Sequence, residues 1–230
     1  MNIENNIKEL RKRVKESALR VNRNPDEINI VAVSKTFPVD YIKEAVRCGI
    51  TDIGENRVQE AEKKIIELGN IARWHMVGHL QRNKVKKAVR LFDIIHSVDS
   101  LRLAEEINSR TEKIPFPILI EVNISGEESK FGIEPDKAIE LAKSISKLKN
   151  LKVEGLMTVP PFGLPSEEIR PYFRNLRLLK EEIDRMGIFN EKLKYLSMGM
   201  TGDFEIAIEE GANIIRIGTA IFGERKKCMF

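Results

Sequence analysis

Cysteine is scarce in this chain of 230 residues, which holds only two, Cys48 and Cys228. They lie far apart and form no CxxC motif, so we expect ordinary thiols in a reducing compartment rather than a disulfide framework. The sequence also has no run of about 18 apolar residues that could form a transmembrane helix. Its first 17 residues lack the apolar core of a signal peptide. These absences predict a cytoplasmic protein with no membrane partner.

Two glycine-rich phosphate-binding motifs are missing as well. Neither GxGxxG nor a Walker loop occurs, and an open doubly wound sheet usually carries one of them after its first strand. That fold is therefore disfavoured. There is also no linker rich in proline, glycine and serine that would separate two domains.

Charge of one sign is not concentrated in any region. The formal net charge is +4 and the sequence pI is about 9.0, which leaves weak nucleic-acid binding open. However, lysines alternate with glutamates along several helix-like segments, a pattern typical of solvated helix faces. Even the basic cluster at residues 84–90 is expected to be such a face. We expect no specific nucleic-acid partner.

What the sequence does contain is a regular alternation of two kinds of segment. Residues 3–22 place apolar side chains three or four positions apart, which predicts an amphipathic helix. The β-like runs that follow are 28–34, 52–54, 73–77, 93–97, 116–124, 151–158, 193–197 and 213–217. The helix-like stretches between and after them are 39–48, 56–68, 81–90, 99–112, 135–148, about 171–187, 202–210 and a short helix from Thr219.

This alternation predicts right-handed βαβ units and a parallel sheet. Eight such units indicate an α/β protein with a single (β/α)8 barrel, or TIM barrel, as one domain over residues 1–230. The N-terminal helix would then be an extra element packed outside the barrel. The loop at residues 159–165 would lie at the active-site face.

The three histidines do not form a metal site in this pattern. His75 and His79 are four residues apart but lack the glutamate of a zinc-binding HExxH helix, and they fall on a predicted strand. Convergent cysteine and carboxylate ligands are also missing, so we expect no metal. His75 and His96 are expected to be hydrogen-bonded residues of the barrel or of an interface.

Lys35 follows the first predicted strand directly, at the end of INIVAVSK. A strand that delivers one lysine at its tip can place the amine at an active-site mouth, where it can lose its proton and form a Schiff base with an aldehyde. The alternative is an ordinary solvated lysine at the start of a loop. The residues at the other strand ends favour the functional interpretation.

Polar and glycine residues gather where the last two strands end. In barrels, the loops after strands seven and eight commonly bind phosphate, helped by the N-terminus of a short helix. Here these loops contain Ser197, Gly199, Gly218 and Thr219. Glycine allows close backbone approach and hydroxyls donate hydrogen bonds, although turns and helix caps use the same residues. A lysine near a phosphate site suggests pyridoxal 5′-phosphate, or a class I aldolase acting on a sugar phosphate.

A family resemblance distinguishes these two possibilities. The segments VAVSKTFP, IGENRVQEA, WHMVGHLQRNK, EVNISGEESKFGI, GLMTVPP, LSMGMTGDFEIAIEEGA and IRIGTAIFGER resemble the YggS/PROSC family of pyridoxal-phosphate homeostasis proteins. The resemblance covers nearly the whole chain in order. It implies a barrel like the N-terminal domain of alanine racemase, and pyridoxal 5′-phosphate as cofactor.

The resemblance also implies roles for individual residues. Lys35 would carry the cofactor, and Arg216 would face the pyridine nitrogen and keep it unprotonated, because a neighbouring like charge disfavours protonation. The phosphate would be held by Ser197, Gly218 and Thr219, in a turn shaped by Met198 and Gly199. Residues expected to line or approach the ring pocket are Asn56, Met157 and His79.

The function implied is that of a carrier or regulator of free pyridoxal phosphate. Alanine racemase-like enzymes use a second acid/base group from an added β-domain, and we expect this chain to lack that domain. The alternative is an amino-acid racemase, decarboxylase or lyase with weak activity, since the bound cofactor has intrinsic chemistry. Apo forms of pyridoxal-phosphate enzymes are candidate partners, and a monomer is expected.

Overall fold

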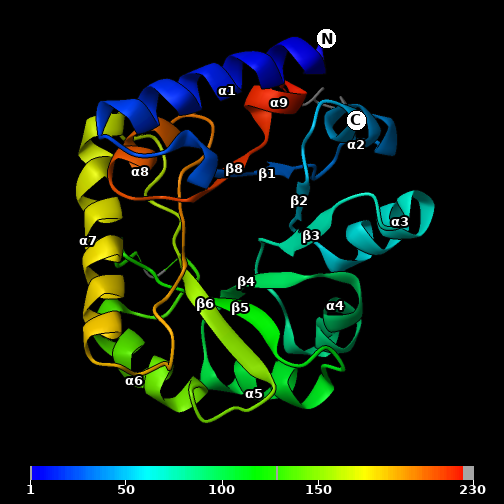
Figure 1. Ribbon diagram of the computed structural model, residues 1–230. Helices are drawn as coiled ribbons and strands as arrows, with labels where there is room; N and C mark the ends of the chain where they lie inside the picture. Colours follow the sequence, from blue (N-terminus) through cyan, green and yellow to red (C-terminus); the bar gives the residue numbers. More distant parts are fainter. Residues whose placement is uncertain (1, 128, 225–230) are drawn as a thin grey trace.

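The computed structural model describes residues 2–127 and 129–224. Its centre is a closed barrel of parallel strands in the order β1 to β8 (Figure 1). The strands are β1 (Asn29–Val33), β2 (Asp52–Glu55), β3 (Arg73–Met76), β4 (Ile94–Val98), β5 (Phe116–Glu121), β6 (Leu151–Met157), β7 (Tyr195–Ser197) and β8 (Ile214–Ile217). The barrel closes because β1 pairs with both β2 and β8, with Val31 opposite Asp52 on one side and Arg216 on the other. The expected (β/α)8 fold is confirmed.

Helices follow the strands and cover the outside of the barrel. They are α1 (Ile3–Arg20), α2 (Val39–Arg47), α3 (Val58–Leu68), α4 (Val85–Leu91), α5 (Leu101–Arg110), α6 (Pro135–Ile145), α7 (Ser166–Arg185), α8 (Phe204–Glu209) and α9 (Thr219–Phe222). Short 3₁₀ turns, η1 (Pro25–Glu27) and η2 (Arg82–Lys84), precede β1 and α4. None of the described helices has the length and apolar composition needed to cross a membrane.

The extra N-terminal helix lies where the sequence places it, outside the barrel. Asn2 caps α1 by accepting a hydrogen bond from the backbone N–H of Asn5 at 2.9 Å, which satisfies an otherwise unpaired donor. The apolar face of α1, including Ile7 and Leu10, is buried. This face covers α8 and α9, as Figure 1 shows. The helix therefore supports the last βα units, which carry part of the site.

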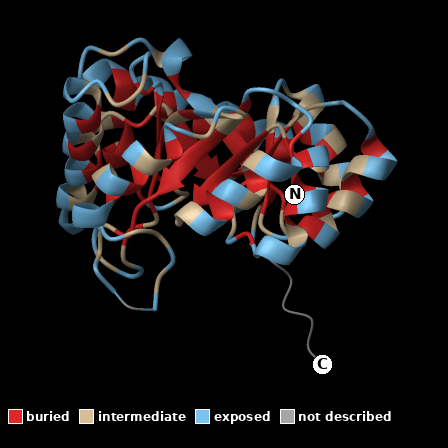
Figure 2. Ribbon diagram, turned by 90° about the horizontal axis from the view of Figure 1, so that it is seen from below, coloured by how far each residue is buried: buried red, intermediate tan, exposed pale blue. Residues whose placement is uncertain are grey.

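The core has two layers. Most buried apolar side chains lie between the strands and the surrounding helices, and Figure 2 shows the strands as the most deeply buried part of the protein. A smaller cluster fills the barrel interior and consists of Val31, Ile94, Leu119, Met157, Tyr195 and Ile214. Because side chains alternate along a strand, these positions define which residues point inward.

The largest difference between a predicted and an observed helix boundary is at the start of α7. α7 begins at Ser166, not near Pro171, and contains that proline. Proline is favoured in the first turn of a helix because it lacks an N–H, which is why the sequence suggests a start there. The additional turn carries Ile169, which is buried and lines the cavity described below. Its apolar packing offsets the backbone hydrogen bond that Pro171 cannot make.

Candidate functional site

A cavity of about 560 Å³ opens at the carboxyl ends of the strands. This volume lies in the usual range for small-molecule and cofactor sites. Five of the residues singled out in the sequence line it: Lys35, Asn56, Arg216, Gly218 and Thr219. Further walls come from Val159 and residues 161–164 in the loop after β6, and from residues 200–203 in the loop after β7. The sequence therefore places these five residues at the end of the barrel where the cavity opens.

The turn that follows β1 fixes the backbone around Lys35. The N–H of Phe37 donates to the carbonyl oxygen of Ser34 at 3.0 Å. Thr36 has a positive φ of 70°, which is uncommon for a non-glycine residue. Its N–H donates to the Glu60 carboxylate on α3 at 2.5 Å. Lys35 is half-buried in this turn and reaches the cavity wall.

A buried ionic cluster lies behind this turn. Oε1 of Glu55 accepts hydrogen bonds from Ser34 Oγ at 2.5 Å and from Lys64 Nζ at 2.7 Å. Lys64 also contacts Glu60 at 2.8 Å. Burial raises the pKa of Glu55, and Lys64 opposes the shift. The strand and helix pattern of the sequence did not predict this cluster. The signal available for it was a glutamate and a lysine at positions expected to be buried.

Arg216 is a buried cation at the wall of the cavity, with 5% of its surface exposed. Its Nη1 donates to the carbonyl oxygen of Ser197 at 2.6 Å and to Ser197 Oγ at 2.7 Å. Its Nη2 donates to the carbonyl oxygen of Thr158 at 2.8 Å. Burial lowers the pKa of Arg216 to about 10, and the carboxyl groups of Glu121 and Asp203 oppose this. The guanidinium remains charged at neutral pH.

Glycine at position 218 leaves the backbone open toward the cavity. Its φ of −106° is accessible to any residue, and an added Cβ would meet no heavy atom closer than 3.5 Å. The fold therefore does not itself require glycine here. A backbone without a side chain at the start of α9 fits close approach of an anionic group. This observation, with Lys35 and Arg216, fits the chemistry of pyridoxal phosphate.

Four of the other predicted residues lie behind the cavity instead of lining it. Met157 belongs to the barrel interior, and Met198 packs in the layer between strands and helices. Gly199 has a φ of 94°, and a Cβ there would lie 2.6 Å from that of Ala207. Its carbonyl oxygen accepts the backbone N–H of Arg216 at 2.9 Å. Ser197 is fully buried between Arg216 and His96.

His79, the last of the predicted residues, also lies outside the described cavity lining. Its ring stacks on Phe131, with centroids 3.9 Å apart, and Nδ1 lies 3.8 Å from the Asp99 carboxylate. Several apolar residues that line the cavity were not predicted from the sequence, among them Phe162 and Ile169. The loop that contains Phe162 was expected at this face, whereas Ile169 lies in the first turn of α7, which the sequence did not predict as helix.

Within residues 2–127 and 129–224, no three potential ligands among His, Cys, Asp and Glu come together as a metal site would require. Cys48 is half-buried and unpaired there. Cys228, the other expected thiol, lies outside the described residues.

Comparisons with known proteins agree with this geometry. Residues 1–226 match the alanine racemase N-terminal domain family. The chain is 45% identical over 229 residues to the pyridoxal phosphate homeostasis protein of Aquifex aeolicus, covering 98% of this chain and all of that one. It is 38% identical to the protein of the same name from Escherichia coli K12, over 97% of both chains.

Solved structures give the same result. PipY of Synechococcus elongatus, in a structure with pyridoxal phosphate bound, is 36% identical with a TM-score of 0.81, covering 91% of this chain and 100% of that one. An alanine racemase of Clostridium difficile is 14% identical with a TM-score of 0.75, covering 99% of this chain and 58% of that one; this likeness concerns the fold alone. The chain belongs to the family of pyridoxal phosphate homeostasis proteins, with a barrel of the alanine racemase N-terminal type.

Proposed function

We propose that this protein binds pyridoxal 5′-phosphate in the cavity, attached to Lys35, and helps to maintain the intracellular level of the cofactor. The observation that carries the proposal is one cavity lined by a half-buried lysine, a buried arginine and open backbone at Gly218. Homologues with the corresponding name, and a relative with the cofactor bound, support it. When bound, the cofactor supplies an aldehyde that condenses with a primary amine.

The residues of this chain have distinct proposed roles. Lys35 provides the amine, and the turn held by Glu60 orients it. The backbone at Gly218 and Thr219 binds the phosphate, and Asn56 lines the ring pocket. Ser197, Met198 and Gly199 support the turn behind the phosphate, and Met157 packs behind the pocket in the barrel interior. His79 would approach the ring from outside the cavity lining.

Arg216 would determine which chemistry of the bound cofactor the site favours. A cation facing the pyridine nitrogen disfavours protonation of that nitrogen, because like charges repel. Arg216 would thereby limit the carbanion chemistry that a bound cofactor can supply. This property favours storage and delivery of the cofactor over rapid turnover of amino acids.

An amino-acid racemase or lyase is the alternative function. Two-sided proton transfer needs a second acid/base group opposite the lysine. Within the described part of the chain, the titratable side chains that line the cavity are Lys35, Asp203 and Arg216. Asp203 already accepts a hydrogen bond from the N–H of Met200 at 2.5 Å. These residues therefore favour a carrier, with at most weak catalysis.

We also propose that the protein is a single-domain monomer in the cytoplasm and passes its cofactor to apo-enzymes. One chain supplies the described walls of the cavity, and the unpaired Cys48 suits a reducing compartment. Light scattering after gel filtration tests whether the protein is a monomer. Cell fractionation tests whether it lies in the cytoplasm. Reactivation of a cofactor-free enzyme by loaded protein, faster than by released cofactor, tests the transfer to apo-enzymes.

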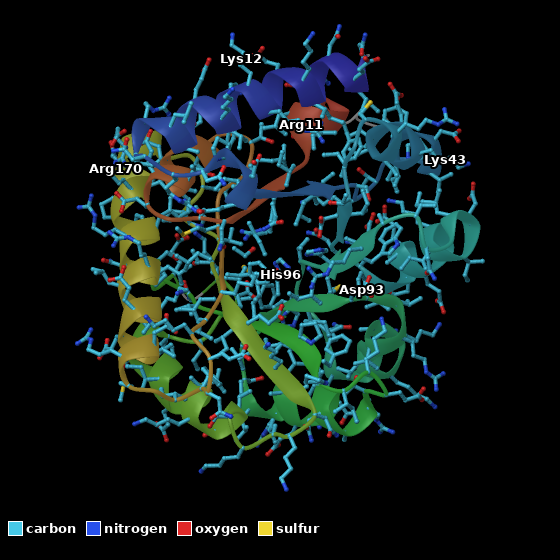
Figure 3. All side chains as sticks on the ribbon, in the orientation of Figure 1. Arg11, Lys12, Lys43, Asp93, His96 and Arg170 are labelled. Atoms are coloured by element: carbon cyan, nitrogen blue, oxygen red, sulfur yellow. The ribbon has the colours of Figure 1, made fainter. Side chains whose placement is uncertain are left out.

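The direct test is the visible absorption spectrum of purified protein, with and without added pyridoxal phosphate. We expect a yellow band in the native protein, and borohydride reduction should fix the cofactor mass on Lys35. Lys35→Ala should lack both. Lys43→Ala is the matched control, because Lys43 lies on α2 at the outside of the barrel (Figure 3). A native protein that takes up no cofactor would refute the proposal.

A further inference from the structure

A line of hydrogen bonds crosses the barrel interior and ends at Arg216. Nε2 of His75 lies 2.8 Å from Oδ1 of Asp52, and Nδ1 of His75 lies 2.9 Å from Nε2 of His96. Nδ1 of His96 lies 3.0 Å from Ser197 Oγ, which accepts from Arg216 at 2.7 Å. Figure 3 shows His96 in the middle of the ring of strands. The five side chains come from β2, β3, β4, β7 and β8.

The two ends of this line determine its direction. The Arg216 guanidinium can only donate hydrogen bonds, and an ionised Asp52 carboxylate can only accept them. When both imidazoles are neutral, Ser197 accepts from Arg216 and donates to Nδ1 of His96. His96 then donates through Nε2 to Nδ1 of His75, which donates through Nε2 to Asp52. With both imidazoles neutral and Asp52 ionised, every group makes both of its bonds only if each ring carries its proton on Nε2.

The surroundings of the line support these protonation states. His75, His96 and Ser197 are all at least 99% buried. Burial lowers the pKa of both histidines, and it does so strongly for His96. Burial opposes ionisation of Asp52, but hydrogen bonds from His75 and Thr51 lower its pKa below the usual value. A cation and an anion thus lie at opposite ends of a neutral chain.

The chain restricts how Arg216 can move. Two of the three described acceptors of the guanidinium are the carbonyl oxygen and Oγ of Ser197, and the third is the carbonyl oxygen of Thr158. Ser197 Oγ cannot rotate away without leaving Nδ1 of His96 unpaired in the barrel interior, which costs free energy. The orientation of the guanidinium is thereby coupled to groups that lie outside the cavity lining.

We propose that Asp52, His75, His96 and Ser197 form a hydrogen-bonded chain of fixed direction that positions Arg216 at the wall of the cofactor cavity. These four are positioning residues, since they act through Arg216. Only one part of this proposal, the effect of Arg216 on the cofactor, rests on the proposed function. The chain itself belongs to the protein without cofactor and can be tested there.

The first experiment records ¹⁵N–¹H correlation spectra of the imidazoles in cofactor-free protein at neutral pH. The sequence has only three histidines, so His79→Asn leaves the signals of His75 and His96 alone. We expect both rings to be neutral, with the proton on Nε2. A ring protonated on Nδ1, or on both nitrogens, would overturn the chain whether or not the protein binds cofactor.

The second experiment interrupts the chain next to Arg216. In cofactor-free Ser197→Ala, the Arg216 guanidinium should rotate more freely, as seen by ¹⁵N relaxation. The variant should bind pyridoxal phosphate about tenfold more weakly, as expected from losing one hydrogen bond to a charged group. The absorption maximum of the bound cofactor should also shift. Unchanged guanidinium motion in Ser197→Ala would overturn the positioning role.

Two variants at His96 distinguish the effect of the directed hydrogen bonds from the effect of side-chain packing. Glutamine can donate and accept along the same line as the Nε2–H imidazole, whereas leucine can do neither. His96→Gln should retain most cofactor affinity and the original spectrum, and His96→Leu should lose both. If His96→Leu does not fold, Ser197→Ala and His96→Gln still decide the question. Equal loss in a folded His96→Gln would show that packing alone matters.

Discussion

Nζ of Lys64 lies 2.8 Å from the carbonyl oxygen of Ser34, the residue directly before Lys35. A lysine on α3 thus binds the backbone next to Lys35, the proposed cofactor-binding amine. The same ammonium neutralises Glu55, which is fully buried and has one carboxylate oxygen without a hydrogen-bond partner. The cluster therefore joins the end of β1 to the end of β2 and to α3.

Lys64→Met should damage both stability and cofactor attachment. It leaves Glu55 buried without its cation, which typically costs about 3–5 kcal/mol, and it releases the carbonyl oxygen of Ser34. We expect a lower midpoint in urea unfolding and weaker formation of the Lys35-linked absorbance band. Lys63→Met is the matched control, because Lys63 is exposed on the same helix and should change neither quantity. Equal behaviour of the two variants would rule out the structural role of Lys64.

Gly78→Ala should disturb Asn56 at the cavity wall. A Cβ at residue 78 would lie 2.6 Å from the carbonyl oxygen of Asn56 and 2.8 Å from its Cα. Overpacking of this kind costs about 1–3 kcal/mol, and the displaced Asn56 should weaken cofactor binding in an absorbance titration. Gly187→Ala, where φ is 61° and no atom lies within 4 Å, should lower stability without affecting binding. Native affinity in Gly78→Ala would contradict this role.

Glu210 connects the end of α8 to α7 through three arginines. Its carboxylate lies 3.3, 2.9 and 3.4 Å from nitrogens of Arg170, Arg174 and Arg177, and its side chain is 6% exposed. Glu210→Gln should cost about 2 kcal/mol of unfolding free energy, since hydrogen bonds to charged groups are lost. Glu181→Gln removes one exposed pair with Arg177 and should cost below about 0.5 kcal/mol. Denaturant unfolding measures the free energy of unfolding of both variants. Similar losses of unfolding free energy in the two would refute the prediction.

The parts of the site that follow from strand order were predictable from the sequence. Lys35 follows the end of β1, and Arg216 lies near the end of β8. The barrel pattern alone therefore brings both residues to the same face of the barrel. The contacts of His75 with His96 were not predictable, because they depend on how barrel closure sets neighbouring strands in register. Ser197 illustrates the same limit: the sequence suggests a phosphate ligand from its hydroxyl, but gives no indication of the hydrogen bond that this hydroxyl accepts from Arg216.

Glu121, at the end of β5, should make stability depend on pH. Burial, together with the nearby carboxylate of Asp99, raises the pKa of Glu121 from 4.5 to about 7, and Arg216 opposes the shift. Between these values the folded protein holds a proton that the unfolded chain has released, so the contribution of Glu121 to stability falls as pH rises from 4.5 to 7. Glutamine stays neutral at every pH in this range. The unfolding free energy of Glu121→Gln should therefore rise by about 3 kcal/mol relative to that of the native protein between pH 4.5 and 7. Urea unfolding at pH 4.5, 6 and 8 measures the difference, and a difference that does not change with pH would show that Glu121 ionises normally in the folded protein.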